Sequence, residues 1–193
     1  MRPDREWYVF YEDDTYILWD NLFRLLDHYD PDLPFYFGSP SAGCRQLGQL
    51  TWFGYGGAGY VLSREAMRRL VKHDWDASGL YLGPKLQEAH WDRTLDVCCG
   101  DSLLGCVLAK EQVTLGGLYP MLTPHQPDQV PFSEQHWCQP ALSMHKPSPN
   151  DMRQLWRWEW EHRQRDVSTR YKGPGQAQLT NWKSCSDHCS GEI

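Results

Sequence analysis

The sequence lacks several features that would assign it to a common class. It contains no run of about 20 apolar residues, the length that crosses a bilayer, so we expect no membrane span. Residues 1–5 carry no apolar core of a signal peptide. Basic residues are also in the minority, because Lys and Arg total 19 against 25 Asp and Glu, which gives a net charge of −6. Binding of nucleic acid requires a basic face, so we expect no nucleic-acid partner.

The cysteine spacing forms no convincing zinc site. Cys185 and Cys189 make a close pair, but no second close pair with a matching Cys or His pattern accompanies them. Disulfides explain the seven cysteines better, which indicates an oxidising compartment and leaves at least one thiol over. Since no signal peptide precedes them, we interpret the chain as the C-terminal part of a longer protein.

The composition is otherwise that of a globular protein with unusually many tryptophans. At 193 residues and 40% hydrophobic content, the chain is long enough for one sizeable core. Its ten tryptophans indicate aromatic walls, either in a core or around a ring-shaped ligand.

An aromatic stretch that ends in three carboxylates is the most informative segment. Glu6–Tyr11 is rich in aromatic residues and predicts a buried strand, and Glu12, Asp13 and Asp14 follow at its C-terminal end. Adjacent carboxylates repel one another, so a site that gathers them usually holds Mg²⁺, Mn²⁺ or Ca²⁺. The alternative is an exposed acidic turn.

A glycine cluster and a helix start are two further candidates. Four glycines between Gly54 and Gly59 allow close backbone approach, or simply turn a tight corner, before Ser63 caps a helix over 64–72. Asp101 occupies a predicted N-cap, where the helix dipole favours negative charge. It is either only that cap or a general base for a substrate hydroxyl.

The remaining pattern predicts two helices and two short strands. The expected elements are a helix over 17–29, a strand over 35–37 with a loop from Gly38 to Gly48, a strand over 141–145, and a helix over 148–163 capped by Ser148 or Asn150. Residues 164–193 are polar and predict a loosely ordered tail.

Five motifs, in the same order along the chain, resemble glycosyltransferase family 31, the inverting β1,3-glycosyltransferases. Within this family the resemblance is strongest to the core 1 galactosyltransferase and fringe-like members, in the divergent form common in fungi. The matching segments are Trp7–Tyr16, Phe35–Gly38, Gly56–Ser63, Gly100–Gly105 and Leu142–His145. The resemblance implies an α/β fold of GT-A type, a Rossmann-like mixed sheet with flanking helices. It also implies that residues 1–163 are the metal and acceptor half of such a domain, with the N-terminal nucleotide-binding part largely missing.

The resemblance implies a role for each matched polar residue. Asp14 and His145 would bind Mn²⁺, with Mg²⁺ as the alternative ion. Glu12, longer by one methylene than the family's usual Asp, would contact either the cation through a water or the sugar. Asp101 matches the catalytic base.

Further residues would line the donor and acceptor or brace the site. Those expected to contact donor or acceptor are Asp13, Gly56, Gly57, Ala58, Trp52, Phe53 and Trp137. For each tryptophan taken singly, core packing is the competing role. Cys98 or Cys99 paired with Cys106 would brace the loop that carries Asp101.

The implied reaction moves galactose or N-acetylglucosamine from a UDP-sugar to a glycan or glycoprotein hydroxyl. The implied location is the Golgi lumen, in a single-pass type II membrane protein whose anchor lies outside this chain, and a homodimer is compatible. A non-catalytic relative that assists an active transferase is the first alternative, and a calcium- or sugar-binding module is the second.

Overall fold

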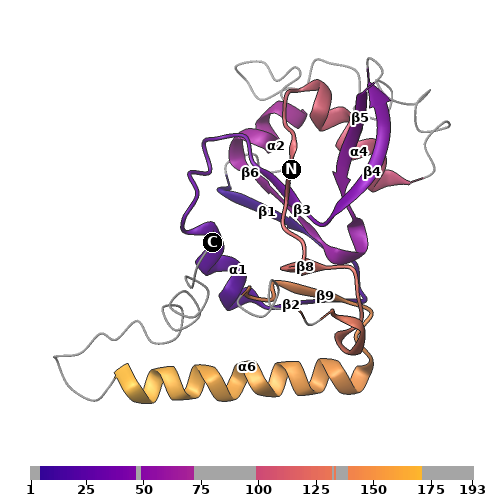
Figure 1. Ribbon diagram of the computed structural model, residues 1–193. Coiled ribbons are helices and arrows are strands. Elements are labelled where there is room, and N and C mark those ends of the chain that lie inside the picture. The colour runs from indigo at the N-terminus through magenta and orange to yellow at the C-terminus, as the bar shows by residue number, and fades with distance from the viewer. Residues whose placement is uncertain (1–4, 47–48, 72–98, 132, 134–138, 171–193) are drawn as a thin grey trace, which may run out of the picture.

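The computed structural model describes residues 5–46, 49–71, 99–131, 133 and 139–170, which form a layered α/β structure (Figure 1). The central layer is a four-stranded sheet with the order β1-β6-β3-β7. In it, β1 (Trp7–Phe10) and β3 (Tyr36–Gly38) pair antiparallel with β6 (Tyr60–Ser63), and β7 (Leu115–Gly117) pairs parallel with β3. The predicted α/β class with a mixed sheet is confirmed.

Both faces of the central sheet are buried, because successive residues of a strand point to opposite sides. One face packs against helix α1 (Trp19–Leu26), and its core consists of Ile17, Leu22, Leu26, Phe37, Ala58, Val61, Leu118, Leu122 and Leu142. The other packs against helices α2 (Arg64–Val71) and α4 (Gly100–Lys110), and its core consists of Tyr36, Leu62, Ala66, Met67, Leu70, Val107, Leu108 and Val113. Double-sided burial explains why β1, β3 and β6 read as apolar runs rather than alternating patterns.

A second, three-stranded sheet joins the two ends of the described chain. Its order is β2-β9-β8, with β2 (Thr15–Ile17) antiparallel and β8 (Leu122–Thr123) parallel to β9 (Ser143–His145). This sheet lies between the central sheet and the long helix α6 (Pro149–Arg170) (Figure 1). The segment after the acidic motif and the segment that ends in His145 are therefore neighbours in space.

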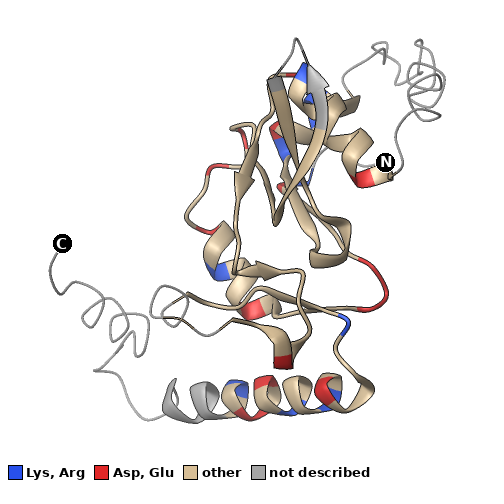
Figure 2. Ribbon diagram, turned by 45° about the vertical axis from the view of Figure 1, so that its right-hand side comes forward, with Lys and Arg blue, Asp and Glu red and all other residues tan. Residues whose placement is uncertain are grey.

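Helix α6 begins at a reciprocal cap. The Asp151 amide donates to Ser148 Oγ at 3.2 Å and the Ser148 amide donates to Asp151 Oδ2 at 2.9 Å, so of the two predicted caps Ser148 is the one used. Acidic and basic residues are interspersed along the helix (Figure 2), and Trp156 and Trp160 stack on each other at 5.9 Å while remaining about half exposed. Within the described ranges, no helix combines the length and apolarity needed to cross a membrane.

Several predicted boundaries differ from the structure, and three of the differences have a clear cause or consequence. The helix expected from residue 17 starts at Trp19, because Thr15–Ile17 are β-branched and aromatic and pair with β9 instead. The loop expected after Gly38 is a hairpin of β4 (Pro40–Gln46) and β5 (Gln49–Gly54). Helix α6 continues to Arg170, past the predicted end at residue 163 and into the predicted tail, while residues 171–193 lie outside the described part.

The remaining short elements in the described residues are two 3-10 turns. A 3-10 turn, η1 (Gly56–Ala58), connects β5 to β6, and another, η2 (Pro127–Gln129), follows β8. The predicted Ser63 cap is confirmed, since the Ala66 amide donates to Ser63 Oγ at 3.1 Å.

Candidate active site

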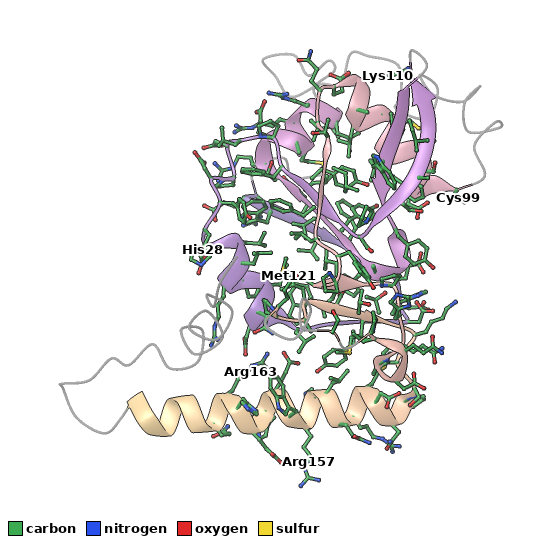
Figure 3. The ribbon with its side chains drawn as sticks, in the orientation of Figure 1. His28, Cys99, Lys110, Met121, Arg157 and Arg163 are labelled. Carbon is green, nitrogen blue, oxygen red and sulfur yellow. The ribbon has the colours of Figure 1, made fainter. Side chains whose placement is uncertain are left out.

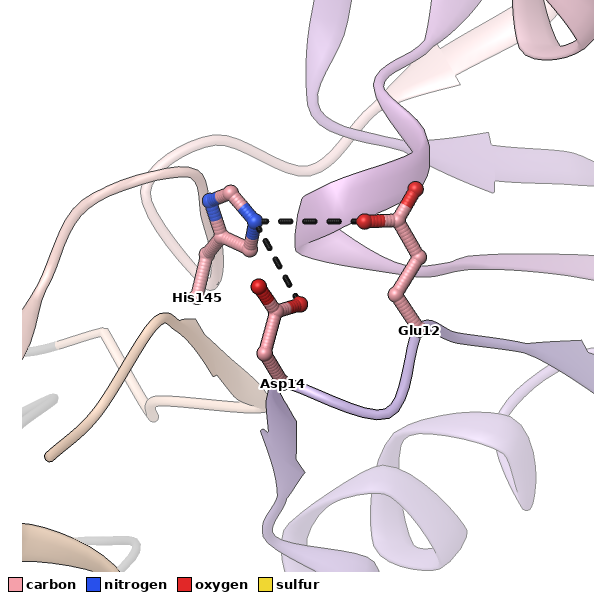
Figure 4. A group of neighbouring side chains, drawn as sticks. All are labelled: Glu12, Asp14 and His145. Carbon is pink, nitrogen blue, oxygen red and sulfur yellow. Dashed lines mark ion pairs between the residues drawn. The ribbon is translucent and has the colours of Figure 1, made fainter. Parts of the chain in front are cut away.

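Three predicted cation ligands meet at one end of the second sheet (Figure 4). Glu12 and Asp14 lie on the turn between β1 and β2, and His145 ends β9. His145 Nε2 is 3.6 Å from Asp14 Oδ1 and 4.0 Å from Glu12 Oε2, and the ligand atoms all lie within 4.8 Å of one another. We call these three residues the acidic–histidine cluster. Asp13, the carboxylate between the two acids, is exposed.

The atoms that face one another in this cluster need a partner. Asp14 Oδ1 and His145 Nε2 are buried, yet neither finds a hydrogen-bond partner within the described part of the chain. His145 Nδ1 lies 3.3 Å from the Pro124 carbonyl, which can only accept, so this bond places the ring proton on Nδ1. Nε2 is then left with its lone pair, as a metal-binding imidazole requires. The donor set fits a divalent cation.

The glycine turn η1 lies against both this cluster and Asp101. A Cβ atom on Gly57 would lie 2.5 Å from His145 Nε2, so only glycine fits beside the imidazole. A Cβ atom on Gly56 would lie 3.1 Å from Glu12 Oε1 and 3.3 Å from Asp101 Oδ2. The backbone of the turn therefore approaches other groups closely, as the glycines predict. These groups are the side chains of His145, Glu12 and Asp101.

Asp101 is held by two backbone amides. Gly56 donates to Asp101 Oδ2 at 2.9 Å, and Ser102 donates to Asp101 Oδ1 at 2.8 Å. The predicted N-cap position is wrong, because α4 begins at Gly100 with Cys99 as its N-cap, which places Asp101 in the first turn. The side chain is oriented by a segment 45 positions away in sequence, and it remains partly accessible.

Two tyrosines beside the site are absent from the sequence-based set. Tyr36 is almost fully buried and its hydroxyl accepts a 2.7 Å hydrogen bond from the Gly54 amide. Burial raises the pKa of Tyr60, and the negative charges of Asp101 and Glu12 raise this pKa further. Tyr60 therefore lies within electrostatic reach of both the cluster and Asp101. The position of Tyr60 directly after Gly59 in the glycine motif is the sequence feature that could have identified it as a residue near the site.

The aromatic residues expected to stack on sugars have different surroundings. Trp52 is 52% exposed, whereas Phe53 is 7% exposed and lies against Gly105 of α4. The burial of Phe53 favours a packing role, and Trp52 keeps a free face. Trp137 lies outside the described residues.

One of the two predicted disulfide pairings is incompatible with α4. Cys99 and Cys106 are seven positions apart along the helix and its cap, a separation of roughly 10 Å at the rise of an α-helix. A disulfide needs Cα atoms within about 7 Å, so Cys99 cannot pair with Cys106. The alternative partner, Cys98, lies outside the described residues.

Comparison with known proteins agrees with the motifs. The Fringe-like family matches residues 1–137. Glycoprotein-N-acetylgalactosamine 3-beta-galactosyltransferase 1 of Xenopus laevis is 44% identical over 69 residues, 36% of this chain and 18% of that protein. The Fringe glycosyltransferase of Drosophila melanogaster is 27% identical over 99 residues, 45% of this chain and 24% of that protein.

The aligned region thus spans about a quarter or less of each relative's length. The family match, in contrast, covers well over half of this chain. It confirms the resemblance to glycosyltransferase family 31, and the mixed α/β architecture is compatible with the GT-A type. The chain belongs to the Fringe-like family.

Proposed function

We propose that this chain carries the metal and acceptor half, residues 1–163, of an inverting glycosyltransferase that uses a UDP-sugar and forms a β1,3 linkage. One observation carries the proposal: a Cβ atom on Gly56 would lie 3.1 Å from Glu12 Oε1 and 3.3 Å from Asp101 Oδ2, so the acidic–histidine cluster and Asp101 meet at the same glycine. An inverting transfer needs a cation site for the leaving diphosphate and a base for the attacking hydroxyl in one small volume. The relatives' names, a galactosyltransferase and a glycosyltransferase, support this class of reaction.

The residues divide the chemistry between them. Asp14, His145 and Glu12 would hold Mn²⁺, with Mg²⁺ as the alternative, and the bound ion would neutralise charge that builds on the diphosphate. Asp101, oriented by the Gly56 and Ser102 amides, would take the proton of the acceptor hydroxyl. The acceptor oxygen forms its bond to the anomeric carbon from one face while the bond to the diphosphate oxygen breaks on the other, which inverts the centre.

The finer assignments rest on the family. We propose galactose or N-acetylglucosamine as the transferred sugar and a glycan or glycoprotein as the acceptor. The site would work in the Golgi lumen, in a protein held there as a type II membrane protein, and Cys98 would form the disulfide with Cys106. Asp13, the glycine turn and Trp52 would contact donor or acceptor. Retention of the cluster and of Asp101 weighs against a non-catalytic assistant of another transferase.

Calorimetric titration of UDP into this chain tests the cation site. We expect binding that requires Mn²⁺ and is lost in Asp14→Ala. The control is Asp27→Ala, which removes the same charge from an exposed position at the end of α1. Binding of equal strength with and without Mn²⁺, or in Asp14→Ala and the control alike, would refute the assignment. Equal tightness for Ca²⁺ and Mn²⁺ in the presence of UDP would favour a calcium- or sugar-binding module.

Asp101→Asn tests the base. The amide keeps the shape of the side chain but cannot take a proton, so sugar transfer by the full-length protein should fall by about 10²- to 10⁴-fold. Mn²⁺-dependent binding of UDP should stay as in the unmodified chain, because Asp101 lies outside the cluster. Unchanged transfer would remove Asp101 from the role of base.

A further inference from the structure

We infer that Thr15 and Ser143 are positioning residues, whose buried hydroxyls fix the glycine turn between the acidic–histidine cluster and Asp101. Thr15 Oγ1 donates to the Gly57 carbonyl at 2.8 Å, and Ser143 Oγ donates to the Ala58 carbonyl at 2.5 Å. The catalytic meaning of this arrangement rests on the proposed function.

The two hydroxyls come from adjacent strands and one face of the second sheet. Thr15 pairs with His145, and Ile17 pairs with Ser143, so the side chains of Thr15, Ser143 and His145 share a face by strand alternation. Thr15 is 7% exposed and Ser143 is fully buried. The opposite face carries Tyr16, which contacts α6 instead.

The same strands therefore position the imidazole and the turn that it touches. His145 closes β9 two residues after Ser143, and Asp14 directly precedes Thr15. A shift of these strands would move the cluster and the turn together. Each donated hydrogen bond also satisfies the carbonyl of a buried residue, Gly57 or Ala58.

The glycine turn, held by these two hydroxyls, in turn orients Asp101. The Gly59 amide donates to the Gly56 carbonyl at 2.8 Å, which closes the turn around Gly57 and Ala58. The Gly56 amide donates to Asp101 Oδ2 at 2.9 Å. A turn released from Thr15 and Ser143 would loosen this amide and, with it, the orientation of the proposed base.

Hydrogen exchange at the Gly56 amide tests the inference without any need for activity. We expect exchange to quicken by about tenfold in Thr15→Val and in Ser143→Ala, because each loses one bond that holds the turn. Thr15→Ser keeps the hydroxyl and should restore slow exchange. The control is Ser63→Ala, which removes an equally buried hydroxyl that donates to the Leu33 carbonyl at 2.6 Å, away from the site. Unchanged Gly56 exchange in both Thr15→Val and Ser143→Ala, or an equal effect of Ser63→Ala, would overturn the inference.

Kinetics supply the second readout. In the full-length protein that carries Thr15→Val or Ser143→Ala, we expect kcat to fall while Mn²⁺-dependent UDP affinity stays within about twofold, since the cluster ligands are retained. Equal loss in both quantities would contradict a role in positioning Asp101. The proposed function gives this chain only half of the domain, so the kinetics require the full-length protein. If the unmodified full-length protein transfers no sugar, the proposed function fails, whereas the exchange measurement still decides whether the hydroxyls hold the turn.

Discussion

Tyr16 donates a 2.5 Å hydrogen bond to Glu159 across 143 positions of sequence. The bond ties β2 to α6, and Glu159 is only 6% exposed. Arg163, which points from α6 toward the body of the molecule (Figure 3), lies 3.4 Å from Glu159 and donates to Asp20 of α1 at 2.7 Å. Helix α6 is thus attached to both elements that follow the acidic motif.

Tyr16→Phe should destabilise the chain by about 1–3 kcal/mol, because it leaves the buried Glu159 carboxylate with Arg163 alone. Denaturant unfolding measures the loss. The control is Tyr29→Phe, since the Tyr29 ring packs against Phe35 and Phe37 and no hydrogen bond of its hydroxyl is found in the described part. Equal losses in the two variants would show that the Tyr16–Glu159 bond contributes nothing.

Gly57→Ala should weaken Mn²⁺-dependent UDP binding by at least about tenfold, because the new methyl group would displace the His145 ring. Gly117→Ala is the matched control, since a Cβ there meets only Pro40 at 3.6 Å, an ordinary contact. Calorimetry compares the two variants. Full affinity in Gly57→Ala would mean that the imidazole is not a ligand.

Mn²⁺ should stabilise the folded chain by mass action, by about 2.7 kcal/mol at one hundred times its Kd. The gain should vanish in His145→Ala. Each variant is compared with itself, with and without Mn²⁺, so the cavity left by the ring cancels. A His145→Ala variant that gains as much stability as the unmodified chain would exclude His145 from the cation site.

Stability should fall at alkaline pH because of Tyr36. Burial, followed by the nearby Tyr60 and the negative charge of Asp101, raises the pKa of Tyr36 above its ordinary value of 10.0. Because the pKa of Tyr36 is raised in the folded state, the unfolded chain loses the phenolic proton first. The stability contribution is therefore complete below the ordinary pKa of 10.0 and is lost as pH rises from there through the folded-state pKa. Tyr36→Phe should therefore flatten the decline of unfolding free energy above about pH 10. Urea unfolding across pH checks the slope, and parallel slopes would contradict the prediction.

The local features were the predictable ones. The aromatic run of β1 and the Ser63 cap follow from residue preferences within a few positions, and both are present. The hairpin β4–β5 was not predicted because Pro40 and Gly43 are poor strand formers. Its packing against α4 stabilises the strands in place of the missing local preference.

The site required knowledge of distant neighbours. Nothing in periodicity places residue 15 opposite residue 145, so only the family resemblance joined His145 to Asp14. Thr15 and Ser143 escaped notice because a buried hydroxyl acquires its role from the carbonyl it meets. The same holds for Tyr60, whose charged neighbours come from β1's end and from α4.

The late position of β9 has a consequence for biosynthesis. The carboxylates of Glu12 and Asp14 leave the ribosome near the start of this chain, but their imidazole partner emerges more than 130 residues later. A nascent or truncated product that stops before Ser143 still has every strand of the central sheet but lacks a residue of the proposed cation site. Cation affinity would then report whether β9 has paired with β2, which a measurement of secondary-structure content alone does not reveal.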